Sequence, residues 1–117
     1  MNPCFATASA LARAIRNGKL TSHEATEAHL ERIERLNGPI NALVVIDRDG
    51  AMKAARAADR AASKKGAKLG PLHGVPITIK EAFDVTGLRT TSSHPPLKDN
   101  VARADASSVA RLRAAAR

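Results

Sequence analysis

A lysine at the end of an apolar run is the residue of this sequence best suited to chemistry. Lys80 ends the run GVPITIK, in which Val75, Ile77 and Ile79 alternate with more polar neighbours. Such alternation is typical of a strand, which would deliver the amine to the space beyond a sheet. A lysine that is buried there loses its preference for the charged form, and a neutral amine can act as a general base. From spacing alone, a solvated surface lysine is the more common outcome.

The histidines and the cysteine do not have the spacing of metal ligands. His23, His29, His73 and His94 never stand four residues apart, and Cys4 is the only cysteine. His73 lies in a glycine-rich loop, where fixing loop hydrogen bonds is favoured over a catalytic role. The glycine-rich segments also lack the Gly-Lys-Ser/Thr pattern of a phosphate-binding loop. We therefore expect no metal ion and no cofactor.

A stripe of cations recurs at three- and four-residue steps and could neutralise phosphates. No Trp or Tyr is present to stack bases, and Asp49 and Asp59 lie among these cations. A solvated helix face is therefore favoured, and nucleic acid is the less favoured partner. A small basic module that binds RNA or an acidic partner stays open as an alternative function. The stripe consists of Lys53, Arg56, Arg60 and Lys64.

The composition indicates one modest globular unit. The chain has 117 residues and a formal net charge of +8, with 44% hydrophobic and 26% charged residues, which excludes a disordered chain of low hydrophobicity. No apolar run approaches the ~20 residues that a membrane span needs, so we expect no membrane partner. The lone cysteine and the lack of a secretory segment favour a cytoplasmic location. Aromatic residues make up only 2%, so the core is expected to be sparse.

Two helices are expected before residue 41. Ala8, Leu11, Ala12 and Ile15 form one face of the first, which Gly18 ends. The sequence Thr21-Ser22-His23-Glu24 has the form of a capping box and predicts the start of the second. Asn37-Gly38-Pro39 is predicted to end it.

Two short strands alternate with two further helices in the rest of the prediction. Residues 42–46, ALVVI, and residues 75–80 are the expected strands. A helix from Asp47 or Asp49 to about Lys65 is expected to bury an alanine stripe, and Asp105 is expected to cap a last helix. The order helix, helix, strand, helix, strand, helix predicts an α/β fold. The alanine stripe is Ala54, Ala58 and Ala61.

The segment LGPLHGVPITIKEAFDVTGLRTTSS, residues 69–93, resembles the lysine-bearing block of the amidase signature family. The resemblance extends to LARAIRNGKLTSHEATEAHLERIERLN and INALVVID before this block, and to DASSVARLRAAAR after it. It implies the N-terminal part of that fold, a mixed sheet covered by helices. Residues 1–68 would then be helical with one short strand, 69–93 the signature block, and 94–117 a loop and a helix.

The resemblance implies that Lys80 is the base of a serine, cis-serine, lysine triad that hydrolyses carboxamides without metal. Glu81 stands where the family commonly has aspartate. The family's serines lie downstream, and neither Ser92-Ser93 nor Ser107-Ser108 has a glycine-rich loop beside it. We therefore expect a truncated chain that is inactive alone, whose substrate-binding residues are unknown.

The partners implied are a small-molecule amide, if the enzyme is complete, and a complementing chain that carries the serines. A piece of the amide-hydrolysing subunit of a glutamine-dependent tRNA amidotransferase is a further alternative.

Overall fold

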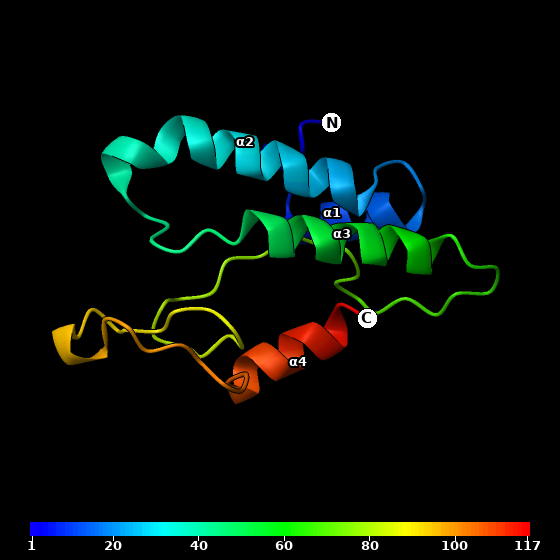
Figure 1. The fold of residues 1–117 in the computed structure, drawn as a ribbon. Helices are drawn as coiled ribbons and strands as arrows, with labels where there is room; N and C mark the ends of the chain where they lie inside the picture. Colours follow the sequence, from blue (N-terminus) through cyan, green and yellow to red (C-terminus); the bar gives the residue numbers. More distant parts are fainter.

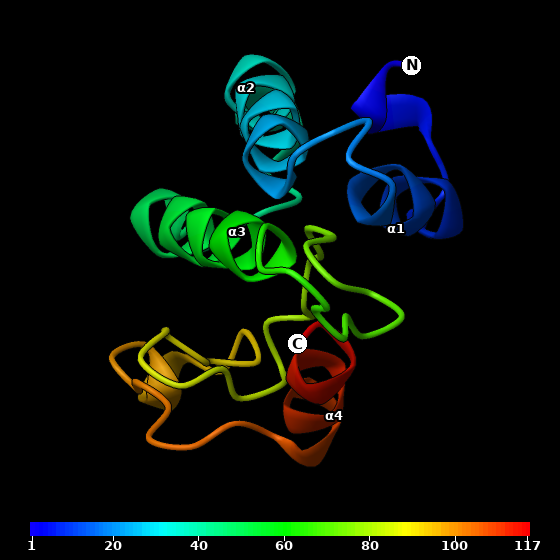
Figure 2. The ribbon, with the colours of Figure 1, turned by 90° about the vertical axis from the view of Figure 1, so that its right-hand side faces the viewer.

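The computed structural model describes residues 1–117 and contains four α-helices and no strand. Helices α2 and α3 pack side by side, with α1 next to them, and α4 lies across the loops on the other side (Figures 1 and 2). No helix is both long and apolar enough to cross a membrane. The elements are η1 (Pro3–Phe5), α1 (Ala8–Arg16), α2 (Ser22–Ile40), α3 (Arg48–Ala62), η2 (Pro95–Leu97) and α4 (Ser107–Ala115), where η marks a 3-10 helix.

The predicted α/β fold, with strands over 42–46 and 75–80, is wrong. Both segments are irregular, and the only β pairing is an isolated bridge between Arg89 and Val101. A strand exists only when a neighbour accepts and donates its backbone hydrogen bonds, and no segment of these residues lies beside either run to do so. Val44 and Ile77 are consequently about half exposed instead of buried in a sheet.

The start of α2 is formed as its sequence predicts. Thr21 Oγ1 accepts a hydrogen bond from Glu24 N at 3.0 Å, and Glu24 Oε2 accepts one from Thr21 N at 2.8 Å. These bonds, the backbone one foremost, hold the pKa of Glu24 below its ordinary value. Gly18, with φ +67°, ends the preceding turn of chain, as predicted. The capping box and the left-handed glycine therefore fix the corner between α1 and α2.

The end of α2 differs from the prediction, because the helix continues through Gly38 and Pro39 to Ile40. Asn41 takes the left-handed cap position, with φ 50°. The side chain of Asn37 accepts a hydrogen bond from Leu43 N at 2.9 Å and donates one to Leu43 O at 2.8 Å. This reach past the helix end stabilises the turn beyond the proline, so the helix does not stop at residue 37.

Helix α3 begins as predicted but buries another face. Asp47 is its N-cap and accepts a hydrogen bond from Gly50 N at 3.0 Å. Met52 and Ala55 are buried, whereas Ala54 is exposed. An alanine-rich helix offers several neighbouring stripes of similar size, so the larger Met52 side chain selects the buried one. The helix ends at Ala62, before the predicted Lys65.

The cap of α4 also differs from the prediction. Its N-cap is Ala106, which provides no side-chain hydrogen bond. Asp105 instead accepts hydrogen bonds from Thr86 N and Thr86 Oγ1, both at 2.8 Å, and from Arg113 Nε at 2.7 Å. The backbone bond from Thr86, followed by the side-chain bond, keeps the pKa of Asp105 low. Asp105 therefore joins the loop at residue 86 to α4.

The start of α2 is joined to α3 through one carboxylate. Asp59 of α3 accepts hydrogen bonds from Ser22 N at 2.7 Å and from His23 N at 3.0 Å. Ser22, only 2% exposed, donates its hydroxyl to Gly74 O at 2.7 Å. Asp59 thus satisfies backbone N–H groups that α2 cannot pair internally, and it does so from another helix.

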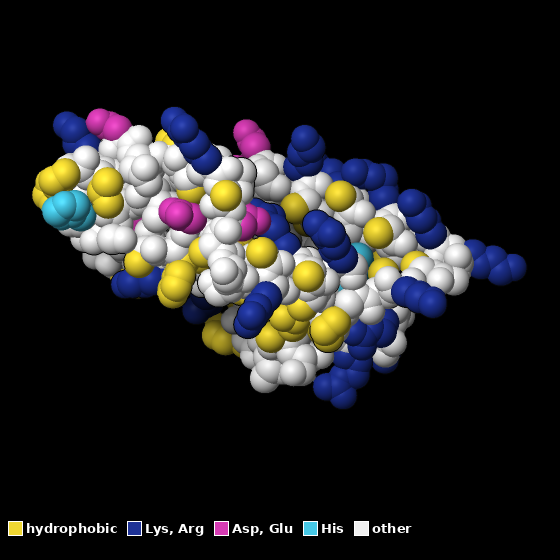
Figure 3. Space-filling view, turned by 90° about the horizontal axis from the view of Figure 1, so that it is seen from below, with side chains coloured by type: hydrophobic (Ala, Val, Ile, Leu, Met, Phe, Trp, Pro, Cys, Tyr) yellow, Lys and Arg dark blue, Asp and Glu magenta, His cyan; other side chains and the backbone are white.

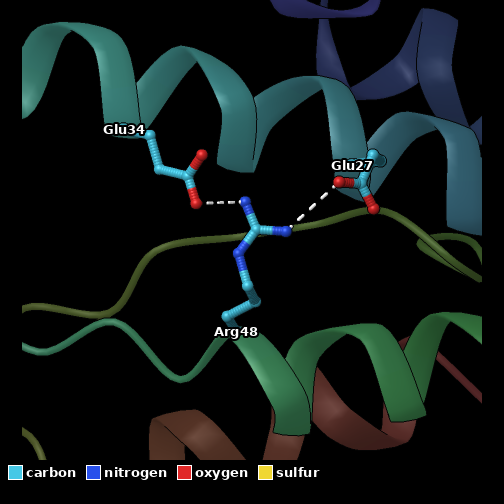
Figure 4. A network of polar contacts seen from close by, with 3 residues as sticks. All are labelled: Glu27, Glu34 and Arg48. Atoms are coloured by element: carbon cyan, nitrogen blue, oxygen red, sulfur yellow. Dashed lines mark hydrogen bonds and ion pairs between the residues drawn. The ribbon is translucent and has the colours of Figure 1, made fainter.

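The opposite ends of the same helix pair are joined by Arg48. Figure 4 shows its guanidinium between Glu27 and Glu34, which lie two turns apart on one face of α2. The hydrogen bond to Glu34, and then that to Glu27, raises the pKa of Arg48. Together with Asp59, this ion pair aligns α2 and α3 along their length.

Gly74→Ala is predicted to destabilise the fold by about 1–3 kcal/mol. Gly74 has φ +72°, and a Cβ there would lie 3.0 Å from Ser22 Cβ and 3.2 Å from Ile15 Cγ2. Gly38→Ala is the matched control, because nothing lies within 4 Å of its Cβ position and alanine favours the helix by about 0.5–1 kcal/mol. Urea unfolding of both variants measures the difference. Equal stability of the two would contradict the close contact at Gly74.

Candidate functional site

The segment before Lys80 is anchored to two helices. His73 is 4% exposed, and its Nε2 lies 2.9 Å from Ala58 O of α3. A carbonyl oxygen only accepts, so Nε2 donates, and Nδ1 is buried without a partner. Leu72 N donates to Ala115 O at 3.0 Å, at the end of α4. A Cβ on Gly70 would overlap that same carbonyl, so only glycine permits the approach.

These contacts confirm the interpretation of His73 as a residue that fixes the loop. It bonds the backbone of α3 and is enclosed, so it faces no substrate. No group of three or more His, Cys, Asp or Glu side chains is arranged to hold a metal ion.

Lys80 lies in a turn that leaves its amine uncovered. Its carbonyl accepts a hydrogen bond from Phe83 N at 2.9 Å, whereas its side chain makes no hydrogen bond or ion pair and is exposed. Ile77 and Phe83, on either side, are 52% and 49% exposed. Within these residues the amine is hydrated, so the desolvation that makes a lysine a general base has to come from elsewhere.

Glu81 holds a strained loop directly beside Lys80. Its carboxylate accepts hydrogen bonds from Thr91 N at 2.5 Å and from Ser92 N at 2.9 Å. Partial desolvation raises the pKa of Glu81, but hydrogen bonds from the side chain and backbone of Thr91 and from the Ser92 and Ser93 backbones together lower it. Ser92 and Ser93 have φ 51° and 55°, a conformation that non-glycine residues avoid. Glu81 therefore offsets the strain of the loop.

A shallow hollow of about 230 Å³ opens at this loop and has no hydrophobic lining residue by side-chain type except a proline. Two hydroxyl side chains and three basic or imidazole groups face it. Its lining is Arg89, Thr91, Ser93, His94, Pro95 and Lys98.

The structure brings some of the sequence candidates together and separates others. Ser92 and Ser93 belong to the loop bonded by Glu81, next to Lys80, whereas Ser107 and Ser108 lie in the first turn of α4. The role of Glu81 was missed by sequence reasoning, because a carboxylate that accepts from a backbone ten residues away leaves no local pattern. Its position beside Lys80 was the only available signal.

The comparisons with known proteins match the lysine block and most of the rest of the chain. A model of the Amidase family matches residues 24–116. The chain belongs to the amidase family. It is 46% identical to the indoleacetamide hydrolase of Bradyrhizobium diazoefficiens over 89% of this chain and 20% of that protein. It is 40% identical to the acylamidase of Rhodococcus erythropolis, over 93% and 23% respectively. One subunit of the glutamyl-tRNA(Gln) amidotransferase of Streptomyces coelicolor is 41% identical, over 93% and 22%.

Solved structures confirm the likeness at the level of the fold. Fatty acid amide hydrolase superposes with a TM-score of 0.88 at 25% identity, over 97% of this chain and 20% of that one. A structure from a vestigial protein complex linked to the origins of an s-triazine catabolic enzyme gives 0.84 at 32% identity, over 90% and 23%. The chain thus spans about a fifth of the length of the relatives it matches and has the conformation of an N-terminal part of the amidase fold, without strands of its own.

Glu81→Gln is predicted to loosen the loop at residues 91–93, because an amide oxygen accepts more weakly than a carboxylate. Backbone amide exchange of Thr91 and Ser92, followed by NMR, should become faster, whereas Glu31→Gln, at an exposed residue without a hydrogen-bond partner, should leave it unchanged.

The pH dependence of the same loop follows from the lowered pKa of Glu81. Its contribution is present above the ordinary carboxyl pKa of about 4.3 and is lost as the pH falls through the folded-state value. Protection of these two amides should therefore decrease below about pH 4 in the wild type and stay flat in Glu81→Gln. Identical profiles for both proteins would refute the assigned contact.

Proposed function

We propose that Lys80 is the general base of an amide-hydrolysing centre whose serines are supplied from outside residues 1–117. The observation that carries the proposal is the match of residues 24–116 to the Amidase family, because this range contains the whole lysine-bearing block. The similarity to proteins named indoleacetamide hydrolase and acylamidase supports carboxamides as the substrate class.

The chemistry proposed for this centre needs two hydroxyl groups and one neutral amine. The amine of Lys80 accepts a proton, through a bridging serine, from a second serine whose oxygen attacks the amide carbonyl. The carbon–nitrogen bond breaks, the departing amine takes the proton back through the same relay, and an acyl-enzyme ester remains. Water then hydrolyses the ester and regenerates the serine. In this scheme Lys80 itself bonds no substrate atom.

Burial of Lys80 is the step that the remainder of an amidase domain has to supply. Ile77 and Phe83 form an apolar border around the exposed amine. A segment that covers this border removes water from the amine and favours its neutral form. We therefore propose that the segment bearing the serines also desolvates the base, so that the centre is inactive until both parts meet.

Glu81 is proposed as a positioning residue. Its two hydrogen bonds to the backbone at residues 91 and 92 fix the turn from which Lys80 projects. Because the next residue in the chain holds a rigid loop, the direction of the Lys80 backbone is also restricted.

The substrate within the amide class is left open by the same matches. Relatives named for indoleacetamide hydrolysis and for tRNA-linked amidotransfer resemble this chain to a similar degree, at 46% and 41% identity. A place as part of the corresponding amidotransferase subunit is therefore the second candidate. The groups that select among amides are expected on other segments.

The test replaces the corresponding N-terminal fifth of the Rhodococcus erythropolis acylamidase with residues 1–117, since the two are 40% identical over 109 residues. The chimera should hydrolyse the amide substrate of the parent enzyme. Lys80→Ala in this chimera is predicted to lower kcat about 10³-fold, within the range that a general base contributes. The 117-residue chain by itself is predicted to give no turnover above background.

Lys68→Ala is the matched control, because Lys68 is an exposed lysine outside the lysine block's terminal turn. It should leave kcat within about twofold, and circular dichroism should report the same helix content for all three proteins. A folded Lys80→Ala chimera with undiminished kcat would show that the proposal is wrong, as would turnover by the isolated chain that survives this substitution.

A further inference from the structure

The outward face of α3 carries a row of cations without counter-ions. Every member is exposed, and none takes part in the three ion pairs of the structure, whose cations are Arg48 and Arg113. Lys65 and Lys68 continue the positive charge into the loop after the helix. We refer to four residues, three within α3 and one just beyond its end, as the α3 cation row: Lys53, Arg56, Arg60 and Lys64.

The acidic residues that interrupt the row in sequence do not neutralise it in space. Asp59 turns away from the row and binds Ser22 N and His23 N at the start of α2. Asp49 lies in the first turn of α3, where it favours the helix N-terminus. In Figure 3 the half of the molecule that contains the later part of α3 and the loop after it shows Lys and Arg side chains but no Asp or Glu.

The spacing of the row suits a polymer of phosphates. With a rise of about 1.5 Å per residue, the four cations extend over about 16 Å of helix axis. Phosphates along a nucleic acid strand recur at a comparable density, so several can be neutralised together. The face carries no aromatic side chain, which excludes stacking on bases and indicates contacts to the backbone alone.

Two other partners fit this face less well. A membrane-surface helix inserts an apolar face, but Met52 and Ala55 of α3 are already buried in the fold. A protein interface usually has aromatic or large aliphatic anchors at its centre, and the residues between these cations include none. We propose that the α3 cation row is a binding surface for the phosphate backbone of nucleic acid, independent of base sequence and of the amide chemistry at Lys80.

The probe is a fluorescein-labelled single-stranded RNA of about 20 nucleotides, titrated with the full chain by fluorescence anisotropy. If about four phosphates are neutralised, the slope of log K against log salt is about −2.8, and affinity falls about 50-fold between 50 and 200 mM salt. Replacing the row by Lys53→Gln, Arg56→Gln, Arg60→Gln and Lys64→Gln should weaken binding at least about tenfold at 50 mM salt and reduce the slope to about one.

The control removes the same net charge elsewhere, at exposed residues that form no ion pair: Arg13→Gln, Lys19→Gln, Arg103→Gln and Arg111→Gln. It should retain binding within about threefold. An equal loss in both variants would mean that net charge alone holds the RNA, and would overturn the proposal.

Poly-glutamate of matched length separates nucleic acid from acidic protein. Competition by this polymer as effective as that by unlabelled RNA would assign the face to acidic polypeptides and overturn the proposal. Circular dichroism verifies that each variant folds. If the fourfold variant does not, Lys53→Gln with Arg56→Gln, and Arg60→Gln with Lys64→Gln, replace it, and each pair should weaken binding at least about threefold.

Discussion

The close contact between Gly74 and the start of α2 is the constraint on which the candidate site depends. Gly74 has a left-handed backbone and lies against Ser22 and Ile15, where a side chain would not fit. Ser22 bonds the carbonyl of Gly74, and Asp59 of α3 bonds the backbone of Ser22. The chain then leaves this contact directly towards Lys80. The position of the lysine is therefore set by backbone geometry six residues before it.

Polar contacts do much of this positioning because the core is small. Only 13 of 117 residues are buried, and among the nine apolar ones are four alanines, which contribute little buried area each. Hydrogen bonds from His73 to α3 and from Leu72 to α4 consequently fix where the loop runs. The same sparse burial leaves Ile77 and Phe83 half exposed, so the segment bearing Lys80 is among the least covered parts of the molecule.

Sequence reasoning succeeded where the deciding interaction is local. The capping box of α2 and the glycine after α1 involve residues at most a few positions apart, and both are as predicted. The strand over 75–80 was wrong, because a strand depends on a partner that the run itself does not specify. The buried face of α3 and the bond from Glu81 to residues 91–92 also required knowledge of distant neighbours. The family, in contrast, was recognisable from the lysine block, whose residue types are constrained jointly.

Asp59 connects the architecture of the chain to its surface charge. In sequence it stands beside Arg60, where its charge would balance part of the basic stripe of α3. In the fold its carboxylate accepts two backbone N–H groups of α2, and this geometry directs it to the opposite side of the helix. Its negative charge thereby stabilises a helix N-terminus, where the backbone dipoles favour an anion. The cations on the outer face are left without compensation for the same reason. An acidic residue that organises the site near Lys80 thus also creates the positive surface of α3.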